Sequence, residues 1–287
     1  MSNILVTGSK GQLGLELVSL ESDFQNYTFF FTDKNNLDIT NFEAVSTFVS
    51  ENNIGIIINC AAYTNVDKAE DEPILANEIN HLAVQNLAKT AKQHHLKLIH
   101  ISTDYVFDGT SKVPYVETSE TNPQNRYGSS KLMGEQALLA INPSNSAIIR
   151  TSWLYSNFGK NFVKTMLRLS EEKETISVVS DQIGSPTNAH DLAKAILQII
   201  PLLKSNGVQL YHYANAGECS WFQFAEEIVK LAQHNCTVLP INSEAFKTQA
   251  KRPKFSLLNT EKIQETFQLT IPHWKDSLKK CIDKLNK

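Results

Sequence analysis

The sequence has no apolar run long enough to cross a membrane. Its longest apolar stretches, residues 54–62 and 196–203 of 287, fall well short of the roughly 20 residues that a membrane-spanning helix needs. The first residues carry no basic segment and no small-residue cleavage pattern of the kind that marks a secretory signal peptide. We therefore expect a cytoplasmic protein with no membrane partner.

Cysteine is scarce, and positive charge is not in excess. The four cysteines, Cys60, Cys219, Cys236 and Cys281, form no CxxC pair, which argues against a zinc site and against a disulfide framework. The formal net charge is -3, so no overall field attracts polyanions, and nucleic acid is not an expected partner. Acids such as Glu16 stand alone in the sequence, which therefore supports no metal site.

What is present is a regular alternation of apolar runs and amphipathic segments in the first half. Five apolar runs are typical of strands, namely residues 3–6, 27–31, 54–59, 97–101 and 147–150. A long helical pattern runs from Pro73 to about His94. This alternation predicts an α/β fold with a Rossmann-like, doubly wound parallel sheet.

The chain is long enough for one large domain and a smaller lobe. We expect residues 1–150 to form an NAD(P)-binding Rossmann domain. After residue 150, prolines separate shorter helices and strands, so residues 151–287 are expected to form mainly a substrate-binding α/β lobe over the carboxyl edge of the sheet. Some segments of this second half are expected to return to the first domain.

A glycine triplet follows the first predicted strand, with Gly8, Gly11 and Gly14 in a GxxGxxG spacing. Gly8 would permit a tight turn, Gly11 the close approach of a pyrophosphate, and Gly14 the packing of the following helix on the sheet. The spacing differs from the more familiar GxGxxG, but its place after a strand favours a dinucleotide-binding turn. The same turn contributes the candidate cofactor-binding residues Lys10, Gln12 and Leu13.

Asp33 follows the second predicted strand, about 20 residues beyond the glycine turn. A carboxylate there would bind a ribose hydroxyl and repel a 2′-phosphate, which favours NADH. Lys34 comes next and could accommodate NADPH, so both cofactors stay open. The segments that we expect to border adenine and ribose contain Asp38, Ile39, Ala61, Ala62 and Tyr63.

Tyr127 and Lys131 lie one turn apart at the start of an apolar-patterned helix. This spacing places phenol and ammonium on one helix face, where the positive charge would lower the pKa of the phenol. Such a tyrosine can give a proton to a carbonyl oxygen while hydride reaches the carbon. Thr103, just after the fourth predicted strand, is the expected third member, because its hydroxyl can hold the substrate oxygen near Tyr127.

Together these motifs resemble the extended short-chain dehydrogenase/reductase family, and within it the reductases of dTDP-sugars. The resemblance covers most of the chain. The matching segments, in order, are TGSKGQLG at 7–14, NCAAYTNVDKAE at 59–70, STDYVFDG at 102–109, YGSSKLMGE at 127–135, RTSWLY at 150–155, GKNFVKTMLRL at 159–169, VVSDQIGSPT at 178–187 and RPKFSLLNTEK at 252–262.

The resemblance implies hydride transfer from NADPH or NADH to C4 of dTDP-4-dehydro-β-L-rhamnose, which gives dTDP-L-rhamnose. The resemblance implies that Tyr127 is the proton donor. It also implies that Lys131 tunes Tyr127 and binds the nicotinamide ribose, and that Thr103 polarises the ketone.

Four further residues are candidates for substrate binding. Trp153 could stack on the deoxysugar or on thymine. Arg252 could bind the diphosphate, because a guanidinium fork matches phosphate oxygens. Asp104 and Asn161 are weaker candidates.

Two other functions stay open. Related chains serve as non-catalytic, NADP-binding regulatory subunits of methionine adenosyltransferase, although Thr103, Tyr127 and Lys131 are all retained here. Other relatives are sugar-nucleotide epimerases or dehydratases on the same scaffold. The resemblance also leaves Mg²⁺ dependence and a homodimer open, and the sequence supports neither.

Overall fold

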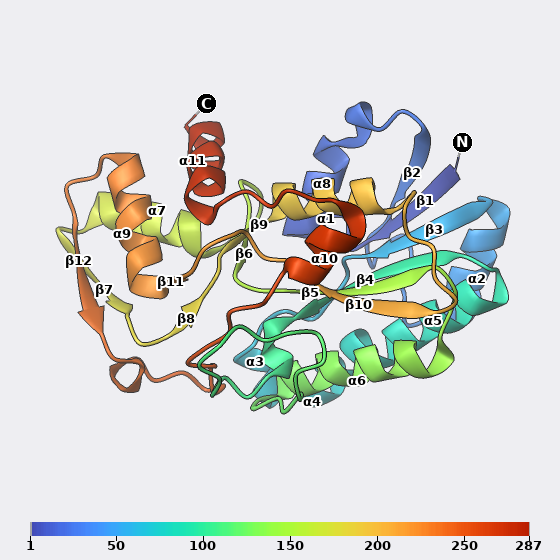
Figure 1. Cartoon of the computed structure of the whole chain (residues 1–287), viewed down its shortest axis with the longest axis horizontal. Coiled ribbons are helices and arrows are strands. Elements are labelled where there is room, and N and C mark those ends of the chain that lie inside the picture. The colour runs from blue at the N-terminus through green and yellow to red at the C-terminus, as the bar shows by residue number, and fades with distance from the viewer. Residues whose placement is uncertain (1, 287) are drawn as a thin grey trace.

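The computed structural model describes residues 2–286 and has a large domain, built on a six-stranded sheet, with a smaller lobe beside it (Figure 1). Neighbouring strands of the sheet run parallel in the order β10-β5-β4-β3-β1-β2. These strands are β1 (Ser2–Thr7), β2 (Tyr27–Phe31), β3 (Ile54–Asn59), β4 (Lys97–Thr103), β5 (Ser146–Thr151) and β10 (Val208–His212). The predicted Rossmann-like α/β fold is confirmed.

Helices cover both faces of the sheet, because successive strand residues are apolar on both sides. The helices of this domain are α1 (Gln12–Ser19), α2 (Phe42–Glu51), α3 (Lys68–Asp71), α4 (Pro73–Asn77), α5 (Ala83–Gln93), α6 (Arg126–Ile141), α8 (Ala189–Ile199) and α10 (Glu261–Phe267). Ile4 and Val6 of β1 pack in one core with α1 and α8, whereas Leu5 packs in the other core with α2, α5 and α6. The carboxyl ends of the strands stay uncovered by these two layers.

The long helix predicted between the third and fourth strands contains a π-helical turn, η2 (Glu78–Leu82), between α4 and α5. In this turn Asn80 Nδ2 donates to the Tyr63 carbonyl and to the Ser130 hydroxyl, both at 3.0 Å. Gly134 of α6 allows the close approach, since a Cβ there would lie 2.1 Å from the Asn80 carbonyl oxygen. These contacts hold α6 beside the loop that follows β3.

The smaller lobe has its own apolar core, which includes Met166, Phe224 and Leu278. Its elements are β6 (Leu154–Tyr155), α7 (Phe162–Glu172), β7 (Thr175–Val179), β8 (Ile183–Gly184), β9 (Thr187–Asn188), β11 (Cys219–Ser220), α9 (Trp221–Ala232), β12 (Thr237–Ile241) and α11 (Trp274–Leu285). The chain also contains one-turn 3₁₀ segments at η1 (Glu21–Asp23), η3 (Asp104–Val106) and η4 (Ser243–Ala245). From the second half, β10 joins the large sheet and α8 packs on α1. The domain roles given to residues 1–150 and 151–287 stay a prediction.

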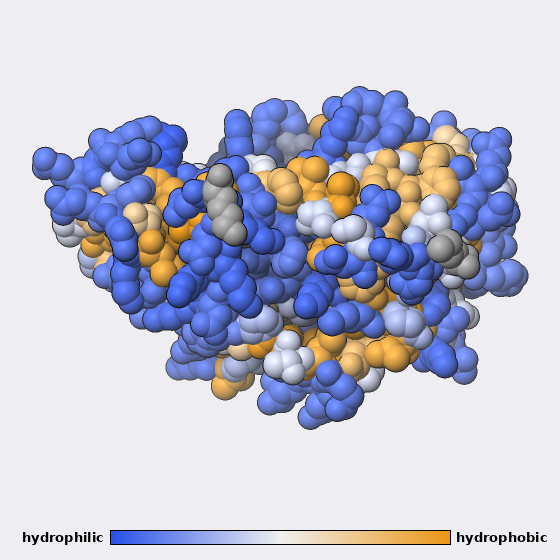
Figure 2. Space-filling view, turned by 90° about the horizontal axis from the view of Figure 1, so that it is seen from above, coloured by the Kyte–Doolittle hydropathy of each residue, from blue (hydrophilic) through white to orange (hydrophobic). Residues whose placement is uncertain are grey.

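The surface seen from above is mostly hydrophilic, with apolar patches over the larger domain (Figure 2). Among residues 2–286, no helix is long and apolar enough to cross a membrane. The same residues form no group of three or more His, Cys, Asp or Glu side chains that could hold a metal ion. Glu16 is buried and accepts hydrogen bonds from the Ser156 hydroxyl at 2.5 Å and from His190 Nδ1 at 3.1 Å.

Candidate active site

A cavity of ≈ 1030 Å³, which we call the main cleft, opens at the carboxyl edge of the sheet. Ligands of open parallel sheets bind at this edge. The predicted site residues that line it are Gly8, Lys10, Gly11, Gln12, Leu13, Asp33, Asp38, Ile39, Ala61, Ala62, Thr103, Asp104, Tyr127, Lys131, Trp153 and Asn161. Of the predicted set, Gly14, Tyr63 and Arg252 are not among the described residues that line this cleft.

The turn between β1 and α1 has the shape of a phosphate-binding loop. Gly8 has a φ of 66°, and a Cβ there would lie 2.6 Å from the Ala61 backbone nitrogen, so glycine is required. Gly11 is the N-cap of α1, and among the described residues no side chain caps the helix, which leaves its N–H groups available to an anion. Gly14 lies against the loop itself, since a Cβ would be 2.5 Å from the Gly8 carbonyl oxygen. A side chain at position 14 would therefore meet the turn first.

Asp33 and Lys10 form an ion pair beside the main cleft. Asp33 Oδ1 also accepts a hydrogen bond from the Asn35 N–H at 2.8 Å. The hydrogen bond from Lys10 is the main cause that holds the pKa of Asp33 below its ordinary value. Since Lys34 lines the same cavity, one carboxylate and two ammonium groups stand where this fold binds the adenine ribose of a dinucleotide.

Tyr63 turns its side chain away from the main cleft. Its hydroxyl donates to Glu72 Oε2 at 2.6 Å, and this bond is the main cause that raises the pKa of Tyr63 to about 12. Ala61, Ala62 and Thr64 line the cavity. The wall after β3 is therefore built from small side chains rather than from the tyrosine ring.

Tyr127 stands in the first turn of α6, where the N-cap Asn125 accepts a hydrogen bond from the Gly128 N–H at 2.8 Å. The side chain is buried, and burial raises the pKa of its phenol to about 12. The Thr103 hydroxyl opposes this rise, and the charge of Asp104 adds to it. The phenol therefore holds its proton at neutral pH.

The pKa of Tyr127 is raised and not lowered, and the ammonium of Lys131 is directed toward strand β4. The predicted effect of Lys131 on the phenol stays a prediction. Lys131 Nζ donates to the Ile101 carbonyl at 2.6 Å and lies 3.4 Å from His100 Nε2. The side chain is buried, and burial lowers the pKa of Lys131 itself to about 8, against the opposing charge of Glu135. Lys131 is thus held by strand β4 beneath the main cleft.

Thr103 ends β4 and lies between two other polar groups. Its hydroxyl donates to Asp104 Oδ1 at 3.1 Å and accepts from the Tyr105 N–H at 3.2 Å. Asp104 is buried, and burial raises its pKa to about 6, although its hydrogen bond with the Thr103 hydroxyl opposes the rise. Thr103 must therefore give up its bond to Asp104 before its proton can point at a substrate.

A buried ion pair fixes α6 on the sheet, and it was missed from the sequence. Arg150 of β5 donates to Glu135 of α6, with Nη2 to Oε2 at 2.6 Å and Nε to Oε1 at 2.9 Å. Both side chains are almost fully buried, at 4% and 1% exposure. The available signal was a charged residue at the end of an otherwise apolar strand. Because Tyr127 and Lys131 are also on α6, this pair sets the position of both.

Trp153 and Asn161 connect the main cleft to the smaller lobe. The Trp153 ring stacks on Trp221 with centroids 3.6 Å apart, and the Trp153 backbone has a φ of 48°. Asn161 caps α7, and its Nδ2 donates to Gln12 Oε1 at 2.9 Å. Gln12 belongs to the helix that follows the glycine turn, so this bond joins the smaller lobe to the cofactor side of the cleft.

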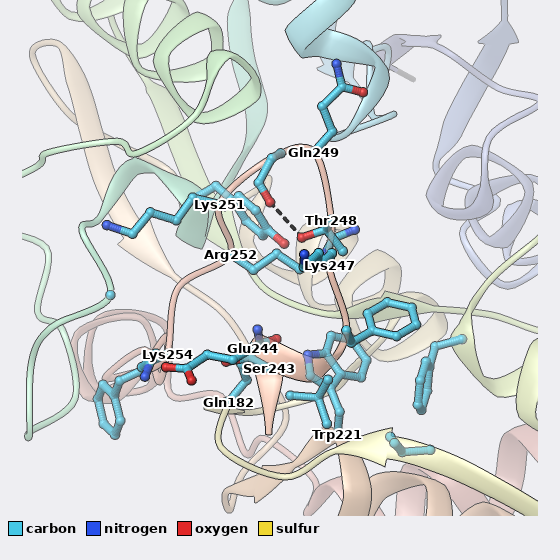
Figure 3. A pocket seen from close by; sticks show the side chains of 18 of the residues that line it. Gln182, Trp221, Ser243, Glu244, Lys247, Thr248, Gln249, Lys251, Arg252 and Lys254 are labelled. Atoms are coloured by element: carbon cyan, nitrogen blue, oxygen red, sulfur yellow. Dashed lines mark hydrogen bonds between the residues drawn. The ribbon is translucent and has the colours of Figure 1, made fainter. Parts of the chain in front are cut away.

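Arg252 lines a second cavity of ≈ 1410 Å³, and Tyr105 lines both cavities. In Figure 3, Arg252 points into this second cavity, whereas Lys251 points away from it. The guanidinium is already paired, since Nη1 and Nη2 donate to the two Asp67 carboxylate oxygens at 3.2 and 2.9 Å. Further lining residues that the sequence did not single out include Gln182, Trp221, Phe246, Lys247 and Lys254.

The comparisons with known proteins agree along the whole chain. The family described as the RmlD substrate binding domain matches residues 1–287. A dTDP-4-dehydrorhamnose reductase of Aggregatibacter actinomycetemcomitans is 40% identical over 97% of this chain and 98% of that protein. The solved structure of such a reductase from Clostridium acetobutylicum has 42% identity and a TM-score of 0.94 over 99% of this chain and 100% of that one. A reductase from Bacillus anthracis, solved in complex with NADP, has 42% identity and a TM-score of 0.93 over the same shares.

Proposed function

The chain belongs to the RmlD substrate binding domain family, and from that premise we propose that it is a dTDP-4-dehydrorhamnose reductase. It reduces the C4 ketone of dTDP-4-dehydro-β-L-rhamnose to dTDP-L-rhamnose with NADPH or NADH. The observation that carries this function is the meeting of Thr103, Tyr127 and Lys131 with the glycine turn in one cleft. These residues come from β4, α6 and the β1–α1 turn.

The main cleft fits a nicotinamide dinucleotide. Gly8 has no Cβ and so leaves room for a pyrophosphate. The uncapped N–H groups of α1 can donate hydrogen bonds to it. The ion pair of Asp33 and Lys10 would border the adenine ribose, where a carboxylate suits NADH and an ammonium suits a 2′-phosphate. When bound, the reduced cofactor supplies the hydride.

Tyr127 gives the proton that the reduced ketone oxygen needs. Its raised pKa keeps the phenol loaded with that proton at neutral pH. Lys131 carries the positive charge that favours the phenolate left after transfer. Thr103 polarises the ketone once its hydroxyl turns from Asp104 to the substrate oxygen.

The second cavity suits the nucleotide part of the substrate. Trp221 and Phe246 offer aromatic faces for a base, and Lys247, Lys254 and Arg252 offer positive charge for a diphosphate. Trp153 and Asn161 stand in the main cleft, where they would contact the sugar. Arg252 would then exchange Asp67 for phosphate oxygens.

The test is NAD(P)H oxidation by the purified protein with dTDP-4-dehydro-β-L-rhamnose, together with identification of dTDP-L-rhamnose as product. Tyr127→Phe should lose most of the activity and keep its affinity for NADPH. A wild-type protein that turns over with neither cofactor contradicts the proposal and favours a non-catalytic NADP-binding subunit. Stoichiometric NAD in the purified protein favours an epimerase, because a reductase must release its cofactor in each cycle.

Cytoplasmic location and a homodimer stay predictions. Size-exclusion chromatography with light scattering tests the second, and repeating it with and without Mg²⁺ tests whether a metal takes part in assembly.

A further inference from the structure

A row of buried polar side chains lies behind Lys131, on three neighbouring strands. Thr7 of β1 pairs in register with Asn59 of β3, and Asn59 pairs with His100 of β4. All three side chains are 1% exposed or less. Strand positions in such a sheet are normally apolar, so this row calls for a specific role.

The amide of Asn59 can take one orientation. Its Oδ1 accepts a hydrogen bond from the Ala61 backbone N–H at 3.2 Å and from the Thr7 hydroxyl at 2.7 Å. A backbone N–H can only donate, so Oδ1 must face it. The Nδ2 group of Asn59 therefore donates to His100 Nδ1, which is 2.9 Å away.

This bond decides where His100 carries its proton. Burial, assisted by the charge of Lys131, lowers the pKa of His100 well below its ordinary value, so the ring is neutral. Since Nδ1 accepts a hydrogen bond, the single proton of the neutral ring is on Nε2. That N–H points at Lys131 Nζ, 3.4 Å away, and offers the ammonium no lone pair.

We propose that Asn59 and His100 are positioning residues that act through Lys131. They fix the Nε2–H tautomer of His100, so that the Ile101 carbonyl alone holds the Lys131 ammonium on the side of the sheet. The remaining N–H bonds of the ammonium then turn toward the main cleft. This inference rests on the proposed function of Lys131. The titratable groups that face Lys131 are His100 on β4, Cys60 after β3 and Glu135 on α6. The fixed N–H of His100 adds to burial in making Lys131 lose its proton more readily than an exposed lysine.

The tautomer can be read directly by long-range proton–nitrogen NMR on protein labelled with ¹⁵N-histidine. The His100 signal is assigned by its absence from His100→Phe. We expect a neutral ring with protonated Nε2 and bare Nδ1 from about pH 6 to about pH 9. A wild-type His100 with its proton on Nδ1 would overturn the proposal. The tautomer itself is measured on the wild-type protein, and the variant serves only to assign the signal.

Two substitutions at one position then separate tautomer from charge. In Asn59→Asp, the new carboxylate accepts a hydrogen bond from His100 Nδ1, so the ring proton moves to that nitrogen. The lone pair of His100 Nε2 can then accept a hydrogen bond from Lys131. Asn59→Leu removes the lock without adding charge. In both, the midpoint of the pH dependence of NADPH binding, measured by fluorescence, should rise by about one unit from its wild-type value near 8.

The matched control is His212→Gln, which alters another buried histidine of the same sheet, on β10. It should leave both the His100 tautomer and the binding midpoint unchanged. A midpoint that rises in Asn59→Asp but not in Asn59→Leu would mean that charge acts alone, which overturns the tautomer mechanism. Absence of sugar turnover in the wild type would defeat the proposed function and leave the tautomer measurement intact, so the two failures are distinguishable.

Discussion

Asp104 offers a quantitative test of the buried charge beside the catalytic threonine. Burial raises the pKa of this carboxyl from 3.8 to about 6, so the folded chain holds the proton more tightly than the unfolded chain. Below about pH 4 the carboxyl is protonated in both the folded and the unfolded state, so its raised pKa does not lower the free energy of unfolding. As the pH rises from about 4 to about 6 the unfolded state ionises first, and the fold loses stability. Above about pH 6 the loss is complete, at about 3 kcal/mol.

Asp104→Asn removes the charge and keeps an oxygen that accepts the Thr103 hydroxyl. We compare the free energy of unfolding of Asp104→Asn with that of the wild type at each pH. The gain of the variant over the wild type should be about 1.4 kcal/mol larger at pH 8 than at pH 5. The comparison between the two pH values matters most, because any cost of fitting the new amide is the same at both. Urea unfolding followed by circular dichroism measures the difference.

Asp108→Asn is the control from the following loop. Hydrogen bonds with the backbone and side chain of Thr110 lower the pKa of Asp108, so this acid is ionised at both pH 5 and pH 8 in both states. Its effect on the free energy of unfolding should be the same at the two pH values. If Asp104→Asn behaves like Asp108→Asn, the buried carboxyl does not have a raised pKa and the reasoning fails.

Three further predictions concern the scaffold and the cofactor. Glu135→Gln leaves the guanidinium of Arg150 buried without a counter-charge, and urea unfolding should show a loss of about 3–5 kcal/mol; a loss under about 1 kcal/mol contradicts this. Gly8→Ala forces a side chain into a left-handed, crowded position, and NADPH affinity should fall at least about tenfold in a fluorescence titration, whereas unchanged binding would show that the turn does not hold the cofactor. Lys10→Ala leaves Asp33 unpaired, so the ratio of NADPH to NADH affinity should fall about tenfold, and an equal loss for both cofactors refutes a selective role.

Much of the fold followed from local pattern. The apolar run at residues 54–59 became β3 with the predicted bounds, because a strand covered on both faces needs apolar residues at nearly every position. Gly8 was predicted to make a tight turn, and its φ of 66° agrees. These features depend on a few consecutive residues, which is why they can be predicted without the rest of the chain.

The partners of individual polar groups did not follow from local pattern. The i,i+4 spacing placed Lys131 near Tyr127, but its ammonium reaches the Ile101 carbonyl and His100 instead. Arg252 meets Asp67, although these residues are far apart in the sequence. Such choices depend on which distant groups the fold brings within about 3 Å, and no spacing along the chain encodes that distance.

The sequence by itself determined the sheet, the glycine turn and the residue types available for proton transfer, since strand and helix periodicity and backbone freedom at glycine act over short range. The tertiary structure alone decided their electrostatic state. It buried Tyr127 and Asp104, which raised the pKa of each, and it placed His100 behind Lys131. Burial and hydrogen-bond partners set these pKa values, and both are properties of the packed chain.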